Sequence, residues 1–170
     1  GGLRHEGTAA VSEDLHDKRP ESVLVVAYTL AGEVLMLRRR RPSWFWQSVT
    51  GSLRWGETPR HAAIRELSEE TGLRAGSALA AWHRQVEFPI VPPWKQRYAP
   101  GEILNREHWF GMPLGSRRTV LLDPREHREC RWLPISEAWR RASSWTNRDA
   151  IACLAPHVLP LRHQVQFRIR

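Results

Sequence analysis

The sequence predicts an α/β fold in which one mixed β-sheet has helices on both faces. Segments rich in β-branched residues alternate with helical segments, but not in the strict β-α-β order of a purely parallel sheet. The sequence has no internal repeat, and 170 residues with 41% hydrophobic composition suit one core rather than two. We expect one domain over residues 18–155, with a flexible N-terminal arm (1–17) and a C-terminal tail or edge strand (156–170).

The first predicted elements form a β-hairpin. The apolar run at 22–30 is rich in β-branched residues, and the turn Ala31-Gly32 separates it from a second apolar run at 34–37. Two such runs around a short turn are typical of a hairpin. A short strand is expected at 47–50, leading into Gly51.

The segment 59–70 has the best-marked helix boundaries in the chain. Thr58 can cap its N-terminus, Pro59 suits its first turn, and Gly72 lies just past its end. Start and stop signals therefore agree on one helix.

The second half of the chain carries weaker signals. A last helix is expected to begin at Thr146, where Asp149 three residues later makes an imperfect capping box. The proline-rich loop 88–93 is too long for a simple turn and is expected to frame a pocket. The remaining predicted elements are strands at 82–88, 108–112 and 131–133 and a helix near 136–142.

The charge points to an anionic ligand, and the tryptophan content points to a binding cleft. The formal net charge is +8, and Lys18 and Lys95 are the only lysines among 26 basic residues. Such a field attracts phosphates or nucleic acid, although a bias towards arginine can also reflect genome composition. Among the nine tryptophans, some should line a binding cleft and the others should belong to the core.

The two cysteines, Cys130 and Cys153, lack CxxC spacing, which argues against a disulfide framework or a thiolate zinc site. A reducing cytoplasm fits this usage. No basic leader with an apolar run and no apolar stretch of membrane-spanning length occurs, so no membrane association is expected. His61, His108 and His127 are isolated in sequence and form no spaced pair for zinc.

The strongest chemical signal lies in the stretch GSLRWGETPRHAAIRELSEETGL, which begins at Gly51. On a helix, Glu66, Glu69 and Glu70 fall within one arc of ~100°, because positions three and four apart share a face. Such a patch of carboxylates suits a hard divalent cation, and Mg²⁺ can also bridge to substrate phosphates and lower the pKa of an attacking water.

The alternative interpretation of these glutamates is a solvated acidic helix face, which is what most charge clusters are. The longer pattern argues against it. Arg65 lies one turn before Glu69 and could orient it by charge-assisted hydrogen bonds, and Glu57 could pair with the same arginine.

The stretch resembles the signature of the Nudix hydrolase family, whose box it matches at every fixed position: Gly51, Glu57, Arg65, Glu66, Leu67, Glu69, Glu70, Gly72 and Leu73. The resemblance implies an α/β/α sandwich around a mixed sheet. It also implies dependence on Mg²⁺ or Mn²⁺, and attack of water at a phosphorus of a nucleoside diphosphate linked to another group.

Further stretches resemble one branch of the family, the dihydroneopterin triphosphate diphosphatases: KRPESVLVV, VLMLRRR, FWQSVTGS, VEFPI, RYAPG and SWTNRDAI. The likeness covers roughly residues 18–154. It implies conversion of 7,8-dihydroneopterin triphosphate to the monophosphate and pyrophosphate in folate biosynthesis. Enzymes of this kind also resemble general nucleoside triphosphate pyrophosphohydrolases.

This resemblance implies roles for individual residues. The implied metal ligands are Glu66, Glu70 and Glu126, and the implied catalytic residues are Glu66, Glu69, Glu126 and Arg65. Substrate contacts are implied at Lys18, Arg39, Thr50, Phe88, Pro89, Ile90, Val91 and Ser144. Each has a competing interpretation: Arg39 can be a solvated charge, Phe88 can be core, and Glu129 competes with Glu126.

Two stretches depart from the branch. The loop 40–44 is basic, and Arg54-Trp55 stands where acidic residues are expected. Added positive charge favours polyphosphates in general, so a broader set of nucleoside triphosphates or capped RNA is an alternative substrate class. A nucleic-acid-binding regulator on a Nudix scaffold is an alternative of another kind, motivated by the charge and the tryptophans, but such modules usually lose box carboxylates and this chain keeps them. The sequence leaves the oligomeric state open.

Overall fold

The computed structural model describes residues 17–90, 94–102 and 104–154. The predicted N-terminal arm, except Asp17, and the predicted C-terminal tail lie outside these residues. Within them, no helix has the length and apolar character needed to span a membrane.

One seven-stranded sheet forms the centre of the molecule. Along its main path the strands run in the order β3-β2-β1-β6-β5, with β4 also beside β1 and β7 also beside β2. The strands are β1 (Glu21–Thr29), β2 (Glu33–Arg39), β3 (Trp46–Gln47), β4 (Val49–Ser52), β5 (Ala80–Pro89), β6 (Leu104–Leu114) and β7 (His127–Pro134). The β1–β6 pair is parallel and the others are antiparallel, so the sheet is mixed, as predicted.

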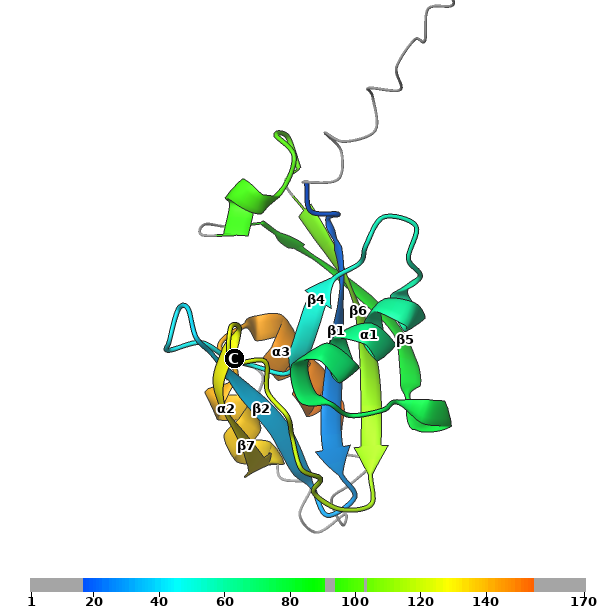
Figure 1. Ribbon diagram of the computed structural model, residues 1–170, viewed down its shortest axis with the longest axis vertical. Coiled ribbons are helices and arrows are strands. Elements are labelled where there is room, and N and C mark those ends of the chain that lie inside the picture. The colour runs from blue at the N-terminus through cyan, green and yellow to red at the C-terminus, as the bar shows by residue number, and fades with distance from the viewer. Residues whose placement is uncertain (1–16, 91–93, 103, 155–170) are drawn as a thin grey trace, which may run out of the picture.

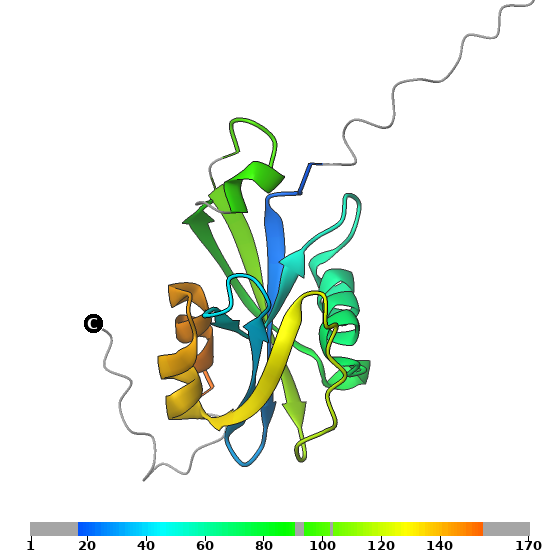
Figure 2. The same ribbon diagram turned by 60° about the vertical axis from the view of Figure 1, so that its left-hand side comes forward.

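Helices cover both faces of this sheet. They are α1 (Pro59–Thr71), α2 (Ile135–Arg141) and α3 (Trp145–Ala152), and two short 3₁₀ segments span Gly76–Ala78 and Trp94–Arg97. The turned view places the sheet between α1 on one side and the α2–α3 pair on the other (Figure 2). The predicted α/β/α sandwich is therefore confirmed (Figure 1).

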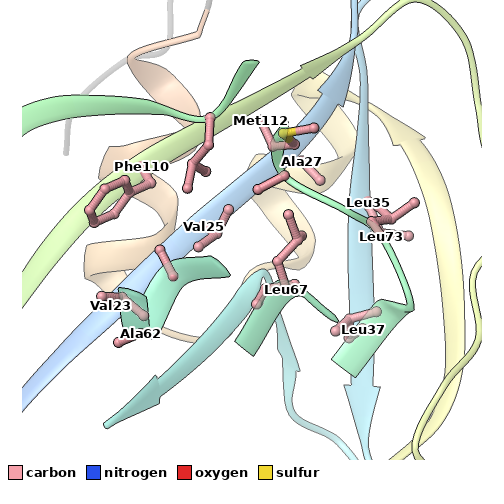
Figure 3. Packing of buried hydrophobic residues seen from close by; sticks show 14 of the residues in the cluster. Val23, Val25, Ala27, Leu35, Leu37, Ala62, Leu67, Leu73, Phe110 and Met112 are labelled. Carbon is pink, nitrogen blue, oxygen red and sulfur yellow. The ribbon is translucent and has the colours of Figure 1, made fainter. Parts of the chain in front are cut away.

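The boundaries of α1 follow the sequence signals. The Thr58 hydroxyl accepts a hydrogen bond from the His61 N–H at 3.2 Å, and Gly72 ends the helix in the left-handed conformation with φ of 73°. The inner face of α1 packs through Ala62 and Leu67 on the core side chains of the sheet (Figure 3). This packing fixes the helix that carries the glutamates.

The start of α3 differs from the prediction. The helix begins at Trp145 with Ser144 as its N-cap, and the Ser144 hydroxyl accepts from the Asn147 N–H at 3.2 Å. Thr146, the predicted start, is already helical and buried. The Ser144 hydroxyl accepts from the backbone N–H three residues later, as an N-cap residue does. The Thr146–Asp149 pair is a weaker N-terminal signal, because a capping box has Glu or Gln where Asp149 stands.

The predicted strand at 47–50 is in fact two strands. β3 pairs with β2, whereas β4 pairs with the N-terminal half of β1, so the chain changes partner between them. At the change, the Ser48 N–H donates to Asn147 Oδ1 at 2.7 Å instead of to a strand. β1 thus pairs with β4 over residues 22–25 and with β2 only near Tyr28.

Candidate active site

Arg65 holds the loop before α1 against the helix. Its guanidinium donates to both carboxylate oxygens of Glu57 at 2.8 and 2.9 Å, to Glu66 Oε1 at 2.7 Å and to the Ser52 carbonyl at 3.1 Å. The bonds from Arg65 lower the pKa of Glu57 to about 2, so this carboxylate stays ionised. Because Glu57 binds the Arg65 guanidinium through both carboxylate oxygens, the bond from Arg65 to Glu66 fixes the direction of the Glu66 carboxylate.

Three carboxylates, those of Glu66, Glu70 and Glu126, line one space and repel one another electrostatically. Glu70 is almost fully buried, and its Oε2 accepts from the Thr50 N–H at 3.1 Å. Burial, followed by the charges of Glu66 and Glu126, raises the pKa of Glu70 well above its ordinary value. Burial likewise raises the pKa of Glu66, although Arg65 opposes the rise. The protein alone leaves this negative charge poorly compensated.

The donor set of this cluster fits a hard divalent cation. Ligand atoms of Glu70, Glu126 and His127 lie within 4.8 Å of one another. Mg²⁺ and Mn²⁺ prefer carboxylate oxygens, and a cation there would offset the burial and the repulsion from Glu66 and Glu126 that raise the pKa of Glu70. Burial and the charge of Arg39 lower the pKa of His127 to about 4, so its imidazole is neutral at pH 7. Its Nε2 lies 3.1 Å from Gln47 Nε2.

A cleft of about 1140 Å³ opens over these carboxylates. We call it the charged cleft; its lining includes Lys18, Arg39, Arg40, Arg41, Arg54, Trp55, Arg65, Glu66, Glu70, Arg97, Arg125 and Glu126. Both sequence stretches that depart from the branch contribute to it. Three of these cations, Lys18, Arg39 and Arg97, are close enough to interact. Burial lowers the pKa of Lys18, and repulsion from Arg97 and Arg39 lowers it further. Crowded cations of this kind suit phosphate oxygens.

A second cavity of about 470 Å³ adjoins the cleft. We call it the α3 cavity, because four successive residues at the start of α3, from Ser144 to Asn147, line it. Lys18, Arg39, Thr50, Gly51, Ser52 and Arg97 line both spaces. The two spaces therefore meet at β4 and these three cations.

The expected substrate contacts gather at these two spaces. Phe88, Pro89 and Ile90 line the α3 cavity, so Phe88 faces open space rather than the core; Val91 lies outside the described residues. The Thr50 hydroxyl donates to the Val23 carbonyl at 2.9 Å, and the Ser144 hydroxyl caps α3. Both hydroxyls thus have structural partners, although a hydroxyl oxygen can accept a further hydrogen bond.

A model of the NUDIX domain matches residues 18–154 of the chain. The chain belongs to the Nudix family. Over 138 residues it is 43% identical to dihydroneopterin triphosphate diphosphatase of Escherichia coli K12, covering 79% of this chain and 91% of that enzyme. It is 38% identical to the enzyme of that name from Haemophilus influenzae, covering 79% and 86% of the two chains.

The solved structure of the E. coli dihydroneopterin triphosphate pyrophosphohydrolase is also similar. It superposes on this Nudix chain with a TM-score of 0.76 and 42% identity, covering 81% of this chain and 95% of that one. The sandwich and the box helix described above are thus the fold of a Nudix hydrolase, an enzyme class that acts on diphosphate bonds and generally uses a divalent metal ion.

The remaining glutamates of the Nudix site take different positions. The Glu69 side chain is 51% exposed, bonds to Arg54 and Arg65, and lines neither space. Glu129, the competitor of Glu126, pairs with Arg38 at 3.3 Å and lies outside the cleft. The catalytic role of Glu69 therefore remains a prediction. For the acidic residue outside the box, the geometry favours Glu126 over Glu129.

Sequence reasoning missed several polar residues of the Nudix site. Arg97 lines both spaces, and His127 joins Glu70 and Glu126 although it is isolated in sequence. Glu107 and Asn105 are buried on β6 and line the α3 cavity. Their neighbours Arg106 and His108 are polar as well, so no apolar–polar alternation in the sequence marks Asn105 and Glu107 as buried.

Proposed function

We propose that this Nudix hydrolase converts 7,8-dihydroneopterin triphosphate to its monophosphate and pyrophosphate with the aid of Mg²⁺. The single observation that carries the proposal is the junction at β4, where Lys18, Arg39 and Arg97 stand between the carboxylate cluster and the α3 cavity. A flat ring in the cavity would place its triphosphate along these cations and next to the glutamates. The named relatives support this substrate.

In the reaction, one water molecule is consumed and one P–O–P linkage breaks. Lys18, Arg39 and Arg97 bind the phosphate oxygens and offset their charge. Glu66, Glu70 and Glu126 would hold the cation, which when bound would supply Lewis-acid polarisation of the phosphate and lower the pKa of the attacking water. Arg65 is a positioning residue that keeps Glu66 in place.

Glu69 acts through the same arginine in this proposal. Its carboxylate lies 3.3 Å from Arg65 Nη1 and 3.4 Å from Arg54 Nη2, which ties the box helix to the loop that precedes it. The exposed pair with Arg54 contributes little to stability. Its function is to restrain the arginine that orients Glu66.

The test is incubation of the protein with 7,8-dihydroneopterin triphosphate and MgCl₂, with pyrophosphate and the monophosphate measured as products. We expect one pyrophosphate per monophosphate formed, and no release by the Glu70→Gln variant. Efficient cleavage of ordinary nucleoside triphosphates without release from the pterin compound would overturn the proposed substrate.

A second candidate is hydrolysis of nucleoside triphosphates in general. Arg40, Arg41, Arg54 and Arg125 line the charged cleft and could bind any polyphosphate. Measuring kcat/KM for the ordinary nucleoside triphosphates beside the pterin compound separates the two candidates, because a general enzyme would cleave all nucleoside triphosphates with similar kcat/KM. The nucleic-acid-binding alternative predicts no turnover at all.

A further inference from the structure

Two buried polar groups of the α3 cavity have no part in the phosphate chemistry proposed above. They are the Glu107 carboxylate and the Asn105 amide, which lie two residues apart on the same face of β6. Only 4% of Glu107 and 2% of Asn105 are exposed, and both line the cavity. Neither lines the charged cleft.

These groups keep unused hydrogen-bond capacity. Trp109 Nε1 donates to Glu107 Oε1 at 3.0 Å, and Thr146 also bonds to this carboxylate. An ionised carboxylate has about four acceptor positions, so acceptor sites remain. Asn105 Nδ2 donates to Ser22 Oγ at 2.8 Å, while Asn105 Oδ1 is buried without a partner among the described residues. Buried acceptors without donors are costly.

The rest of the cavity suits a flat ring. Leu24, Phe88, Ile90 and Trp145 supply apolar surface, and the volume of about 470 Å³ falls within the range of small-molecule sites. Apolar walls combined with unmatched acceptors select a planar ligand that carries N–H donors along one edge.

We propose that Glu107 and Asn105 recognise the edge of a bicyclic ring that bears an amino group next to a ring N–H, which is the shared edge of pterins and guanine. The ring N–H and one amino hydrogen donate side by side to the Glu107 carboxylate. The second amino hydrogen donates to Asn105 Oδ1. Adenine, cytosine and uracil do not present two adjacent donors, and hypoxanthine lacks the amino group.

This assignment rests on the proposed function, because the triphosphate of the same ligand must lie in the charged cleft. The environment of Glu107 supports it. Burial raises the pKa of Glu107 to about 7, against the bonds from Trp109 and Thr146. Ionisation of this buried carboxylate thus costs free energy, and two ring donors would offset that cost.

The test compares kcat/KM for GTP, ITP and ATP, measured as pyrophosphate release, because ITP differs from GTP only in lacking the amino group. We expect the wild type to prefer GTP over ITP by about 10-fold or more. Glu107→Gln should reduce this ratio to about threefold or less through a higher KM for GTP, with little change in kcat. Glu87→Gln, on the exposed side of neighbouring β5, is the matched control and should keep the wild-type ratio.

An unchanged ratio of GTP to ITP in a folded Glu107→Gln variant would overturn the assignment. A measurement on the wild type covers the case in which the variant does not fold. GMP should inhibit pyrophosphate release about 10-fold more strongly than IMP or AMP, and equal inhibition would overturn the assignment as well. If GTP is preferred as expected but the pterin triphosphate is not cleaved, the proposed substrate is wrong and the recognition of the ring edge stands. If the pterin compound is cleaved but GTP is not preferred, the proposed substrate stands and the recognition of the ring edge is wrong.

Discussion

The Glu66 carboxyl group packs directly against Gly51, at the position that the β-carbon of any other residue would occupy. A β-carbon on Gly51 would lie 2.2 Å from both Cδ and Oε1 of Glu66. The first glycine of the box is therefore required by close approach, because any larger residue would displace a carboxylate that we assign to the cation.

Gly51→Ala should accordingly damage the site while sparing the fold. The clash involves the flexible end of the Glu66 side chain, which can rotate away from Arg65 at little structural cost. We expect affinity for Mg²⁺ and kcat to fall by about 10- to 100-fold, as for lost orientation of a metal ligand. Calorimetric titration with MgCl₂ and pyrophosphate release measure the two effects. Gly115→Ala is the control, since a β-carbon there meets no atom within 4 Å; equal behaviour of the two variants would contradict the explanation.

Glu126→Gln should weaken Mg²⁺ binding and turnover together. Glu126 lies with Glu70 in the cleft, whereas Glu129 is paired with Arg38 outside it. Because even indirect partners of a metal ion are worth 10- to 100-fold, loss of a ligand should cost more than about 100-fold in kcat. Glu129→Gln should change neither quantity appreciably. If Glu126→Gln lost turnover but bound Mg²⁺ as tightly as the wild type, Glu126 would serve as the general base instead.

Arg65→Lys tests whether the fork of the guanidinium, and not its charge alone, orients Glu66. A lysine keeps the charge but cannot bond Glu57 bidentately while also reaching Glu66. We expect kcat to fall by about 10- to 100-fold at saturating substrate, with weaker binding of Mg²⁺. Arg106→Lys, at an exposed pair with Glu87, is the control. Wild-type kinetics in Arg65→Lys would show that the charge is sufficient.

The stability of the protein should depend on pH through Glu107. Its pKa is about 7 in the folded state and 4.5 in the reference state, so the folded protein binds more protons between these values. The contribution of Glu107 to the free energy of unfolding should therefore fall as the pH rises from 4.5 to 7, by up to about 3 kcal/mol. Glu107→Gln removes that loss.

Urea unfolding of the wild type and Glu107→Gln at pH 5, 6, 7 and 8 measures the effect. Other carboxylates contribute alike to both proteins and cancel in the difference. We expect the variant to gain stability relative to the wild type as the pH rises and to level off above pH 7. A difference that is constant across this range would show that Glu107 ionises normally in the folded protein.

Local signals explain which parts of the fold could be predicted. The helix α1 carries its cap, its proline and its terminal glycine within one short stretch, and its glutamates are spaced by the helix itself. The hairpin of β1 and β2 is likewise encoded by neighbouring residues. The same holds for the Arg65–Glu57 pair, which was expected from sequence and is present.

The α3 cavity depends on contacts between distant parts of the chain. Glu107 faces it only because β6 lies parallel to β1 and brings Glu107 beside Ser22, and Asn147 reaches Ser48 across 99 residues. His127 approaches Glu70 through the pairing of β7 with β2. The spacing of residues along the sequence does not indicate such pairings. The family resemblance could therefore point to Phe88 or Ser144, but not to Asn105, Glu107 or His127.

The position of β4 beside β1 has a consequence for how this enzyme can change. The helix that bears the box, α1, covers one face of the sheet and α3 covers the other (Figure 2), while residues of β4 line both the charged cleft and the α3 cavity. Mutations on β6 or α3 can retune which ring is accepted without moving a carboxylate of α1. Selectivity and hydrolysis can thus be inherited, lost or redesigned as separate traits.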